Sequence, residues 1–333
     1  MSEKTRIGVI GGGAWGTALA TAARRGGCTV TLWAREAEVV EAINRRHVNT
    51  GFLPGIALDP AIHATGDLAE AAVAEALLLV TPAQHTRQAT HDLRAVLAPG
   101  TPVVICAKGI ETGSGALMSE VLAETLPETP VAVLSGPSFA AEVARDLPTA
   151  VTLAASDIAL AERLALMIGS THFRPYHGDD PVGTQIGGAV KNVMAIACGI
   201  AKGRGLGDNT GAALITRGLA EMALLGKALG ARRETLMGLS GLGDLVLTCS
   251  HEQSRNFTLG MAVGQGTFLD DYLAGRMTVA EGVASVAATV ALAARHKVDM
   301  PIANAVDAVL NRRADIDLEI AALLGRPASR ELG

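Results

Sequence analysis

The chain has 333 residues, of which 49% are hydrophobic and 18% are charged, and its net charge is −5. These values exclude an intrinsically disordered chain, and the scattered lysines and arginines, with no basic patch interleaved with aromatic residues, exclude a nucleic-acid-binding protein. Because a single hydrophobic core rarely exceeds about 250 to 300 residues, the length predicts two domains.

The first half of the chain, from Arg6 to about Tyr176, alternates short β-branched runs with alanine-rich amphipathic segments. This alternation predicts an α/β fold, with a Rossmann-type, mostly parallel sheet. The expected strands are Arg6–Ile10, Thr29–Trp33, Ile62–Ala64, Leu77–Val80, Val103–Cys106, Val131–Leu134, Ala150–Leu153 and Phe173–Tyr176. The expected helices are Thr17–Arg25, Glu36–Asn44, Asp67–Ala74, Thr86–Leu97, Gly115–Glu124 and Asp157–Met167.

A glycine-rich segment, residues 11–16, follows the first expected strand and precedes the first expected helix, and its sequence GGGAWG matches GxGxxG. Gly11 permits a tight turn, Gly13 lets the backbone approach a pyrophosphate, and Gly16 allows close packing of helix on strand. In this context the segment predicts a dinucleotide site rather than an ordinary glycine-rich turn.

The second expected strand ends at Trp33 and is followed by Arg35 and Glu36. NAD-selective folds usually have an acidic residue here that binds the ribose hydroxyls, whereas a guanidinium can bind a 2'-phosphate. Arg35 therefore favours NADP, Glu36 leaves NAD open, and an exposed Arg35 without a ligand is the simpler alternative.

Lys108 follows the strand that ends at Cys106, on the edge of the sheet where such folds bind ligands. A surface lysine just past a strand is common, so its position alone leaves ligand contact and a solvated side chain equally open.

Beyond about Asp180 the strand signals fade, and the composition predicts a C-terminal all-α domain. A polar stretch with glycine and proline at 177–181 separates the two, so we expect domains at 1–179 and 180–333. The expected helices here are Gly187–Lys202, Ala212–Leu229, Val283–His296 and Ala303–Asn311.

Lys191 shares a helix face with small residues at offsets of three, four and seven, among them Gly188 and Cys198. Removing its ammonium from water would lower its pKa and suit it to exchange a proton with a hydroxyl. The alternative is a lysine at the edge of a packing surface, with its ammonium in water.

Asp244 lies in a glycine-leucine stretch, where a buried carboxylate needs a partner such as a lysine or a substrate hydroxyl. Ser254, Arg255 and Asn256 then supply hydroxyl, guanidinium and amide donors in succession, a set suited to a phosphate. If the three residues lay in an ordinary loop, they would not by themselves indicate a phosphate site.

The four cysteines lie far apart without CxxC spacing, and the eight histidines form no HExxH pattern. We therefore expect a reduced, cytoplasmic protein without a metal site. No run of about 18 apolar residues is present, so no membrane span is expected either.

Taken together, these motifs resemble the bacterial glycerol-3-phosphate dehydrogenases in order and spacing across nearly the whole chain. The segments that carry the resemblance are GGGAWGTALA at Gly11, AKGIE at Ala107, SGPSFAAEVA at Ser135, GGAVKNV at Gly187, TRGLAEM at Thr216, GLGDLVLTC at Gly241, QSRN at Gln253 and VAEGV at Val279. SGPSFA and GLGDLVLTC are highly specific, whereas many dehydrogenases share the glycine loop. The family fold is a Rossmann domain followed by a helical domain of the 6-phosphogluconate-dehydrogenase type.

The resemblance implies an oxidoreductase that uses NADP or NAD to interconvert dihydroxyacetone phosphate and sn-glycerol 3-phosphate, supplying the backbone for glycerophospholipid synthesis. It implies that Lys191 is the proton acceptor, and that Lys108 and Asp244 are further catalytic residues, which orient the C2 oxygen and tune Lys191. The implied substrate contacts are Lys108, Gly136, Ser138, Lys191, Asp244, Ser254, Arg255 and Asn256. The implied cofactor contacts, beside Gly11, Gly13 and Gly16, are Ala14, Trp15, Arg35, Lys108, Ala140, Arg255, Val279 and Glu281. Family members often have serine where this chain has Ala14, which removes one side-chain hydrogen bond.

Two other functions are compatible with parts of the pattern. A reductase of the β-hydroxyacid dehydrogenase type also pairs a Rossmann domain with a helical domain and a lysine, but Ser254, Arg255 and Asn256 favour a phosphate substrate. A regulator that only senses the dinucleotide would not need Lys191 and Asp244 in apolar surroundings. Small-residue helices in the second domain make a homodimer plausible.

Overall fold

The structure, a computed structural model, describes residues 5–274 and 280–327. Its main feature is an eight-stranded sheet in the order β10-β9-β8-β7-β6-β1-β2-β5. The strands are β1 (Arg6–Ile10), β2 (Thr29–Trp33), β5 (Ile62–Thr65), β6 (Ala76–Leu79), β7 (Val103–Ile105), β8 (Val131–Ser135), β9 (Thr149–Ala155) and β10 (Phe173–Gly178). All pairs are parallel except β8 with β9, so the expected mostly parallel sheet is confirmed.

The central strands are apolar on both faces, as strands covered by helices on two sides must be. Every residue of β6 is buried, and two separate clusters of buried side chains lie against the sheet. The helices connecting the strands are α1 (Ala14–Arg25), α2 (Ala37–Glu41) with the π-helix η1 (Ala42–Arg46), α3 (Leu68–Ala72), η2 (Ala83–His85) with α4 (Thr86–Leu93), α5 (Met118–Thr125), α6 (Ala140–Ala144) and α7 (Ile158–Ile168). A hairpin of β3 (Val48–Asn49) and β4 (Leu53–Ala57) forms a second sheet.

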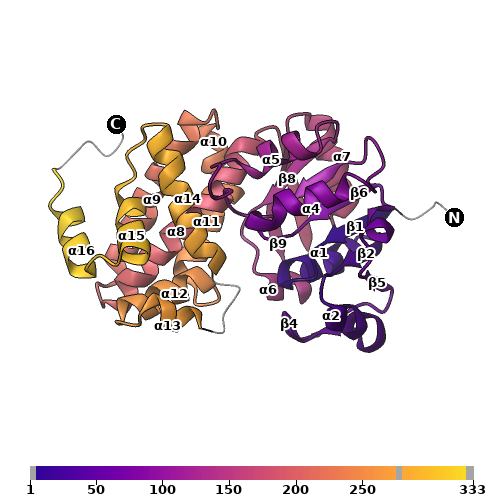
Figure 1. The fold of residues 1–333 in the computed structure, drawn as a ribbon, viewed down its shortest axis with the longest axis horizontal. Coiled ribbons are helices and arrows are strands. Elements are labelled where there is room, and N and C mark those ends of the chain that lie inside the picture. Colours follow the sequence, from indigo (N-terminus) through magenta and orange to yellow (C-terminus); the bar gives the residue numbers. More distant parts are fainter. Residues whose placement is uncertain (1–4, 275–279, 328–333) are drawn as a thin grey trace.

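The chain after β10 is helical through the remaining described residues (Figure 1). Its helices are α8 (Pro181–Gly203), α9 (Asp208–Ala228), α10 (Arg233–Leu236), the π-helix η3 (Leu239–Gly243), α11 (Asp244–Ser250), α12 (Arg255–Gly264), α13 (Leu269–Leu273), α14 (Ala280–Arg295), α15 (Pro301–Arg312) and α16 (Ile316–Leu324).

Helix α8 is the centre of this helical part. Asp180 caps it by accepting a hydrogen bond from Gly183 N at 2.8 Å, and Pro181 occupies its first turn, where a missing N–H costs nothing. Most of its residues are buried against its neighbours, and no helix among the described residues has the length and apolar character needed to cross a membrane.

Candidate active site

The glycine loop lies at the point where the strand order reverses. Strand β1 pairs with β2 on one side and with β6 on the other, and open parallel sheets bind ligands at such a crevice. Gly11 has a φ of +130°, which favours glycine, and a Cβ on Gly16 would stand 1.8 Å from the Gly11 carbonyl oxygen. A Cβ on Gly13 would meet nothing within 4 Å, so open space remains beside the first turn of α1.

Asn49 holds this loop in place. Its Nδ2 donates to Gly12 O and to Thr17 Oγ1, both at 2.8 Å, and the side chain is buried. Asn49 comes from the short strand β3, far from the glycine loop in sequence, so no local pattern reveals it.

Two buried polar atoms near the loop fit a ligand. Trp15 Nε1 and Thr81 Oγ1 have no hydrogen-bond partner in the described parts of the chain, and the Thr81 backbone lies against Gly11. Buried donors are rarely left unpaired, so a bound group with acceptor atoms would satisfy them. Together with the open space at Gly13, they make this edge of the sheet suitable for a dinucleotide.

Arg35 is exposed and forms an ion pair with its neighbour, with Nη2 3.0 Å from Glu36 Oε1. The guanidinium that favours a 2'-phosphate and the carboxylate that favours a ribose therefore contact each other. Exchange of this partner for a ligand requires only a side-chain movement, since 73% of the Arg35 side chain is exposed.

The three predicted catalytic groups form a cluster at the contact between sheet and helices. Lys191 Nζ on α8 lies 2.5 Å from Asp244 Oδ1, and Lys108 Nζ, from the loop after β7, lies 2.8 Å from Asp244 Oδ2. Lys108 Nζ also donates to Gly136 O at 2.9 Å. The sequence predicts a lysine partner for Asp244, and the structure provides two, Lys191 and Lys108.

Small residues allow this approach. A Cβ on Gly188 would stand 2.7 Å from Ser135 Oγ, and one on Gly187 would stand 2.2 Å from Ser240 O. The two glycines thus bring α8 against the end of β8 and against η3, which leads directly into Asp244.

Burial and charge act in opposite directions on these groups. Burial lowers the pKa of Lys191 to about 8, although the Asp244 carboxylate acts to raise it. Burial acts to raise the pKa of Asp244, but the two ammonium groups outweigh it and hold that pKa below its usual value. Asp244 therefore stays ionised near neutral pH, while Lys191 titrates there.

Three further residues complete the polar network, and the sequence did not single out two of them. Thr248 Oγ1 accepts a hydrogen bond from Lys191 Nζ at 3.0 Å. Asn192 Nδ2 donates to Lys108 O at 3.3 Å, and Asn192 Oδ1 accepts from Asn256 Nδ2 at 2.9 Å. The i+4 spacing of Thr248 from Asp244 is the signal that would have identified the threonine.

The predicted phosphate-binding residues begin a helix rather than a plain loop. Ser254 is the N-cap of α12, with its Oγ accepting from Phe257 N at 3.2 Å, and Arg255 and Asn256 form the first turn. A helix N-terminus favours anions through its free N–H groups and dipole. Arg255 is exposed, and its guanidinium has no ion-pair or hydrogen-bond partner among the described residues.

The remaining predicted contacts lie at the ends of neighbouring elements. Ser138 Oγ donates to Gly136 O at 2.9 Å, and Ala140 begins α6. Val279 lies outside the described residues, and the backbone of Glu281 is in the first turn of α14. A Cβ on the next residue, Gly282, would stand 1.9 Å from Asn256 Oδ1, so this turn lies against the start of α12.

Chemically, the cluster combines a fixed carboxylate with one amine that can change its protonation state near neutral pH. Such a pair suits proton exchange with a hydroxyl or carbonyl oxygen. Among the described side chains, no group of three His, Cys, Asp or Glu residues is arranged to hold a metal ion.

Comparison with known proteins agrees with this chemistry. Residues 6–161 match the family model of the NAD-dependent glycerol-3-phosphate dehydrogenase N-terminus, and residues 180–321 match that of the C-terminus. Over 328 residues the chain is 60% identical to a glycerol-3-phosphate dehydrogenase (NAD(P)+) of Rhodospirillum rubrum, covering 98% of this chain and 94% of the relative. The chain belongs to the glycerol-3-phosphate dehydrogenase family.

Other relatives of this dehydrogenase extend the agreement. The corresponding protein of Parvibaculum lavamentivorans is 57% identical and covers 98% of both chains. The crystal structure of a glycerol-3-phosphate dehydrogenase from Coxiella burnetii superposes with a TM-score of 0.92 at 38% identity, covering 97% of this chain and 99% of that one. Family membership decides against the β-hydroxyacid reductase and the dinucleotide sensor that the sequence left open.

Proposed function

We propose that this glycerol-3-phosphate dehydrogenase interconverts dihydroxyacetone phosphate and sn-glycerol 3-phosphate with Lys191 as the group that exchanges the C2 proton. The observation that carries the proposal is the buried contact of Lys191 and Lys108 with the two oxygens of Asp244. A bound NAD(P) supplies or accepts the hydride.

The roles of the three charged groups follow from their environments. Lys191, with a pKa of about 8, takes the hydroxyl proton when the alcohol is oxidised and returns it when the ketone is reduced. Asp244 orients both ammonium groups and keeps its charge. Lys108 donates hydrogen bonds and stabilises negative charge that develops on the C2 oxygen.

The phosphate of the substrate is assigned to the start of α12. Ser254, Arg255 and Asn256 present donors there, and Asn256 reaches the catalytic cluster through Asn192. Gly136 and Ser138 complete the proposed substrate contacts, beside the Lys108 ammonium.

NAD or NADP is assigned to the glycine loop. Gly11, Gly13, Gly16 and the first turn with Ala14 and Trp15 would hold the pyrophosphate. Ala140, Lys108, Arg255, Val279 and Glu281 are proposed as further cofactor contacts. Arg35→Ala tests the preference for NADP, since loss of the guanidinium should raise the Kd of NADPH more than that of NADH. An equal effect on both cofactors would refute the role of Arg35.

The organisation of the whole protein is part of the proposal. We assign the cofactor domain to 1–179 and the substrate domain to 180–333, and the two matched family regions fall on either side of this boundary. A cytoplasmic homodimer that supplies glycerophospholipid synthesis is expected. The exposed apolar side chains of α16, such as Leu324 at 82% exposure, support an association surface.

The test is steady-state oxidation of NADH and NADPH with dihydroxyacetone phosphate, compared with a panel of 2- and 3-oxo acids. Only the phosphorylated ketone should be reduced efficiently, because the donors at α12 match a phosphate. Comparable turnover of an oxo acid would contradict the substrate assignment.

A further inference from the structure

Lys108 lies on an irregular loop whose position needs an explanation. Residues 106–117 connect β7 to α5 with only an isolated bridge between Ile110 and Leu117. These two apolar side chains belong to the core of the helical part, although the loop begins at the sheet. The loop therefore joins both halves of the protein, and its conformation decides where the Lys108 ammonium stands.

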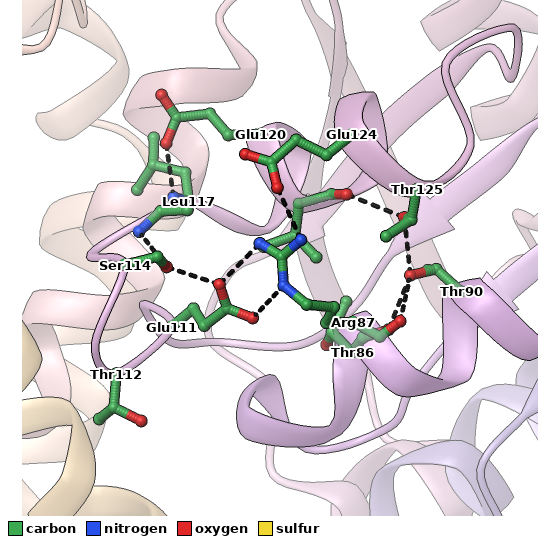
Figure 2. Close-up of polar contacts among 12 residues, drawn as sticks. Thr86, Arg87, Thr90, Glu111, Thr112, Ser114, Leu117, Glu120, Glu124 and Thr125 are labelled. Atoms are coloured by element: carbon green, nitrogen blue, oxygen red, sulfur yellow. Dashed lines mark hydrogen bonds and ion pairs between the residues drawn. The ribbon is translucent and has the colours of Figure 1, made fainter.

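Glu111 is the best-anchored polar side chain of this loop. Its carboxylate accepts two hydrogen bonds from the Arg87 guanidinium, at 2.9 Å from Nε and 2.8 Å from Nη2, and a third from Ser114 Oγ at 2.5 Å (Figure 2). Only 13% of the Glu111 side chain is exposed. A bidentate pair of this kind fixes distance and orientation together.

Gln84 fixes the backbone on both sides of Glu111. Its Nε2 donates to Ile110 O at 2.8 Å, and its Oε1 accepts from Thr112 N at 2.9 Å. Gln84 and Arg87 come from η2 and α4, so both attach the loop to the same support. At the other end, Lys108 O accepts one hydrogen bond within the described part of the chain, the 3.3 Å bond from Asn192 Nδ2.

Arg87 offers an internal comparison. Its Nη1 forms a second ion pair with Glu124 Oε2 at 2.6 Å, but Glu124 is on α5 and not on the Lys108 loop. Both pairs link α4 to a neighbouring segment, and only one of them bears on the site. Replacing either carboxylate removes an ion pair with Arg87, so Glu124 is the control for that loss.

We infer that Glu111 is a positioning residue that acts through Lys108, with the Arg87–Glu111 pair setting the loop so that the Lys108 ammonium stays between Asp244 and Gly136. Loosening the pair lets the ammonium leave Asp244 for part of the time. The inference rests on the proposed role of Lys108.

A second consequence concerns Lys191. The positive charge of Lys108 is one of the influences that lower the pKa of Lys191, beside burial. When Lys108 moves away, the pKa of Lys191 rises, and the pH dependence of glycerol 3-phosphate oxidation moves to higher pH. In the profile of oxidation rate against pH, the limb that rises near pH 8 reports the titration of Lys191. Destabilisation of the fold alone would reduce the amount of active enzyme without moving this limb.

The experiment compares Glu111→Gln with Glu124→Gln in the full-length chain. We expect Glu111→Gln to lower kcat/KM roughly ten- to a hundredfold and to move the limb near pH 8 upward, while Glu124→Gln leaves both unchanged. Thermal unfolding shows whether the two variants lose similar stability. Equal kinetics and an unmoved limb in both would overturn the inference.

A double-mutant cycle tests the route of the effect. If Glu111 acts through Lys108, then Lys108→Met with Glu111→Gln has the same kcat/KM as Lys108→Met alone. A further tenfold loss in the double variant would overturn the inference. If Lys108→Met itself has normal kinetics, the proposed role of Lys108 fails; if Lys108→Met is impaired and Glu111→Gln is normal, only the inference fails.

Arg87→Lys provides the second variant should Glu111→Gln not fold. It keeps the charge but loses the planar fork, so a smaller loss of kcat/KM and a smaller upward movement of the same limb are expected. An unchanged profile in folded Arg87→Lys would equally overturn the inference.

Discussion

Replacing Lys191 tests the proposed chemistry most directly. Lys191→Ala removes the amine while leaving the glycine loop untouched, so cofactor binding should be nearly intact. Loss of a positioned acid-base group typically costs about 10²- to 10⁴-fold in rate. We expect kcat to fall at least about a hundredfold, equivalent to roughly 2.7 kcal/mol of transition-state stabilisation.

The structure gives the reason why this lysine suits the task. Burial lowers its pKa from 10.5 to about 8, a difference of about 2.5. At neutral pH that difference raises the fraction of neutral amine about 300-fold, to roughly one molecule in ten. Oxidation of glycerol 3-phosphate should therefore accelerate as the pH rises through about 8, and reduction of dihydroxyacetone phosphate should slow.

The assay is the change in NADH or NADPH absorbance in both directions across this pH range, combined with cofactor titration by fluorescence. Lys191→Arg is the matched control, because it keeps a positive charge but cannot lose its proton near neutral pH. It should be as defective as Lys191→Ala in alcohol oxidation. Normal turnover in either variant would refute the proton-exchange role.

Three other predictions concern the glycine loop, the hydroxyl beside Lys191 and a buried acid. Gly13→Ala should keep the melting temperature of the protein but weaken cofactor binding about tenfold or more. Gly16→Ala should weaken cofactor binding and also lower the melting temperature, because the added Cβ would stand 1.8 Å from the Gly11 carbonyl oxygen, whereas a Cβ on Gly13 meets nothing within 4 Å. Thr248→Val removes an acceptor 3.0 Å from Lys191 Nζ, so the pKa of Lys191 should fall further and the limb of the oxidation profile should move to lower pH. Burial raises the pKa of Glu221 from 4.5 to about 7, so its contribution to stability is complete below about pH 4.5 and is lost as the pH rises through about 7. Wild type should therefore lose, relative to Glu221→Gln, on the order of 3 kcal/mol of unfolding free energy across this window.

Each of these has a contrary result. Equal melting temperatures for Gly13→Ala and Gly16→Ala would mean that the loop tolerates the close approach. An upward or absent movement of the limb in Thr248→Val would show that the threonine does not stabilise the protonated amine. Parallel pH dependences of unfolding for wild type and Glu221→Gln would show that Glu221 titrates as it does in water.

The sheet follows from the sequence because its strands are short apolar runs with clear ends. All eight expected strands are present, each end within two residues of its expected position, among them β1 and β2 with their bounds unchanged. Helix α8 is longer than expected, because Asp180 and Pro181 start it before the glycines that lower helix propensity.

Helices α11 and α12 were not expected from the sequence, and glycines in η3, directly before α11, and within α12 explain why. A Cβ on Gly241 would stand 2.0 Å from Leu236 O, and one on Gly260 would stand 2.2 Å from Ile196 O. These glycines serve close helix contacts, and tertiary packing overrides their low helix propensity. The same holds for the site, since the roles of Asn49 and Asn192 depend on partners far away in sequence.

The charges of the cluster explain why it needs a substrate. With both lysines protonated, one carboxylate faces two ammonium groups, and only 1% of the Asp244 side chain and 9% of the Lys191 side chain are exposed. A buried charge is costly unless it is paired, so the site lacks one negative charge. An oxyanion that develops at C2 beside these ammonium groups supplies it, and this stabilisation is largest in the transition state. Removing Asp244 would leave both ammonium groups unpaired instead of one. The cost of burying the two protonated lysines would then exceed the gain from their attraction to the developing negative charge.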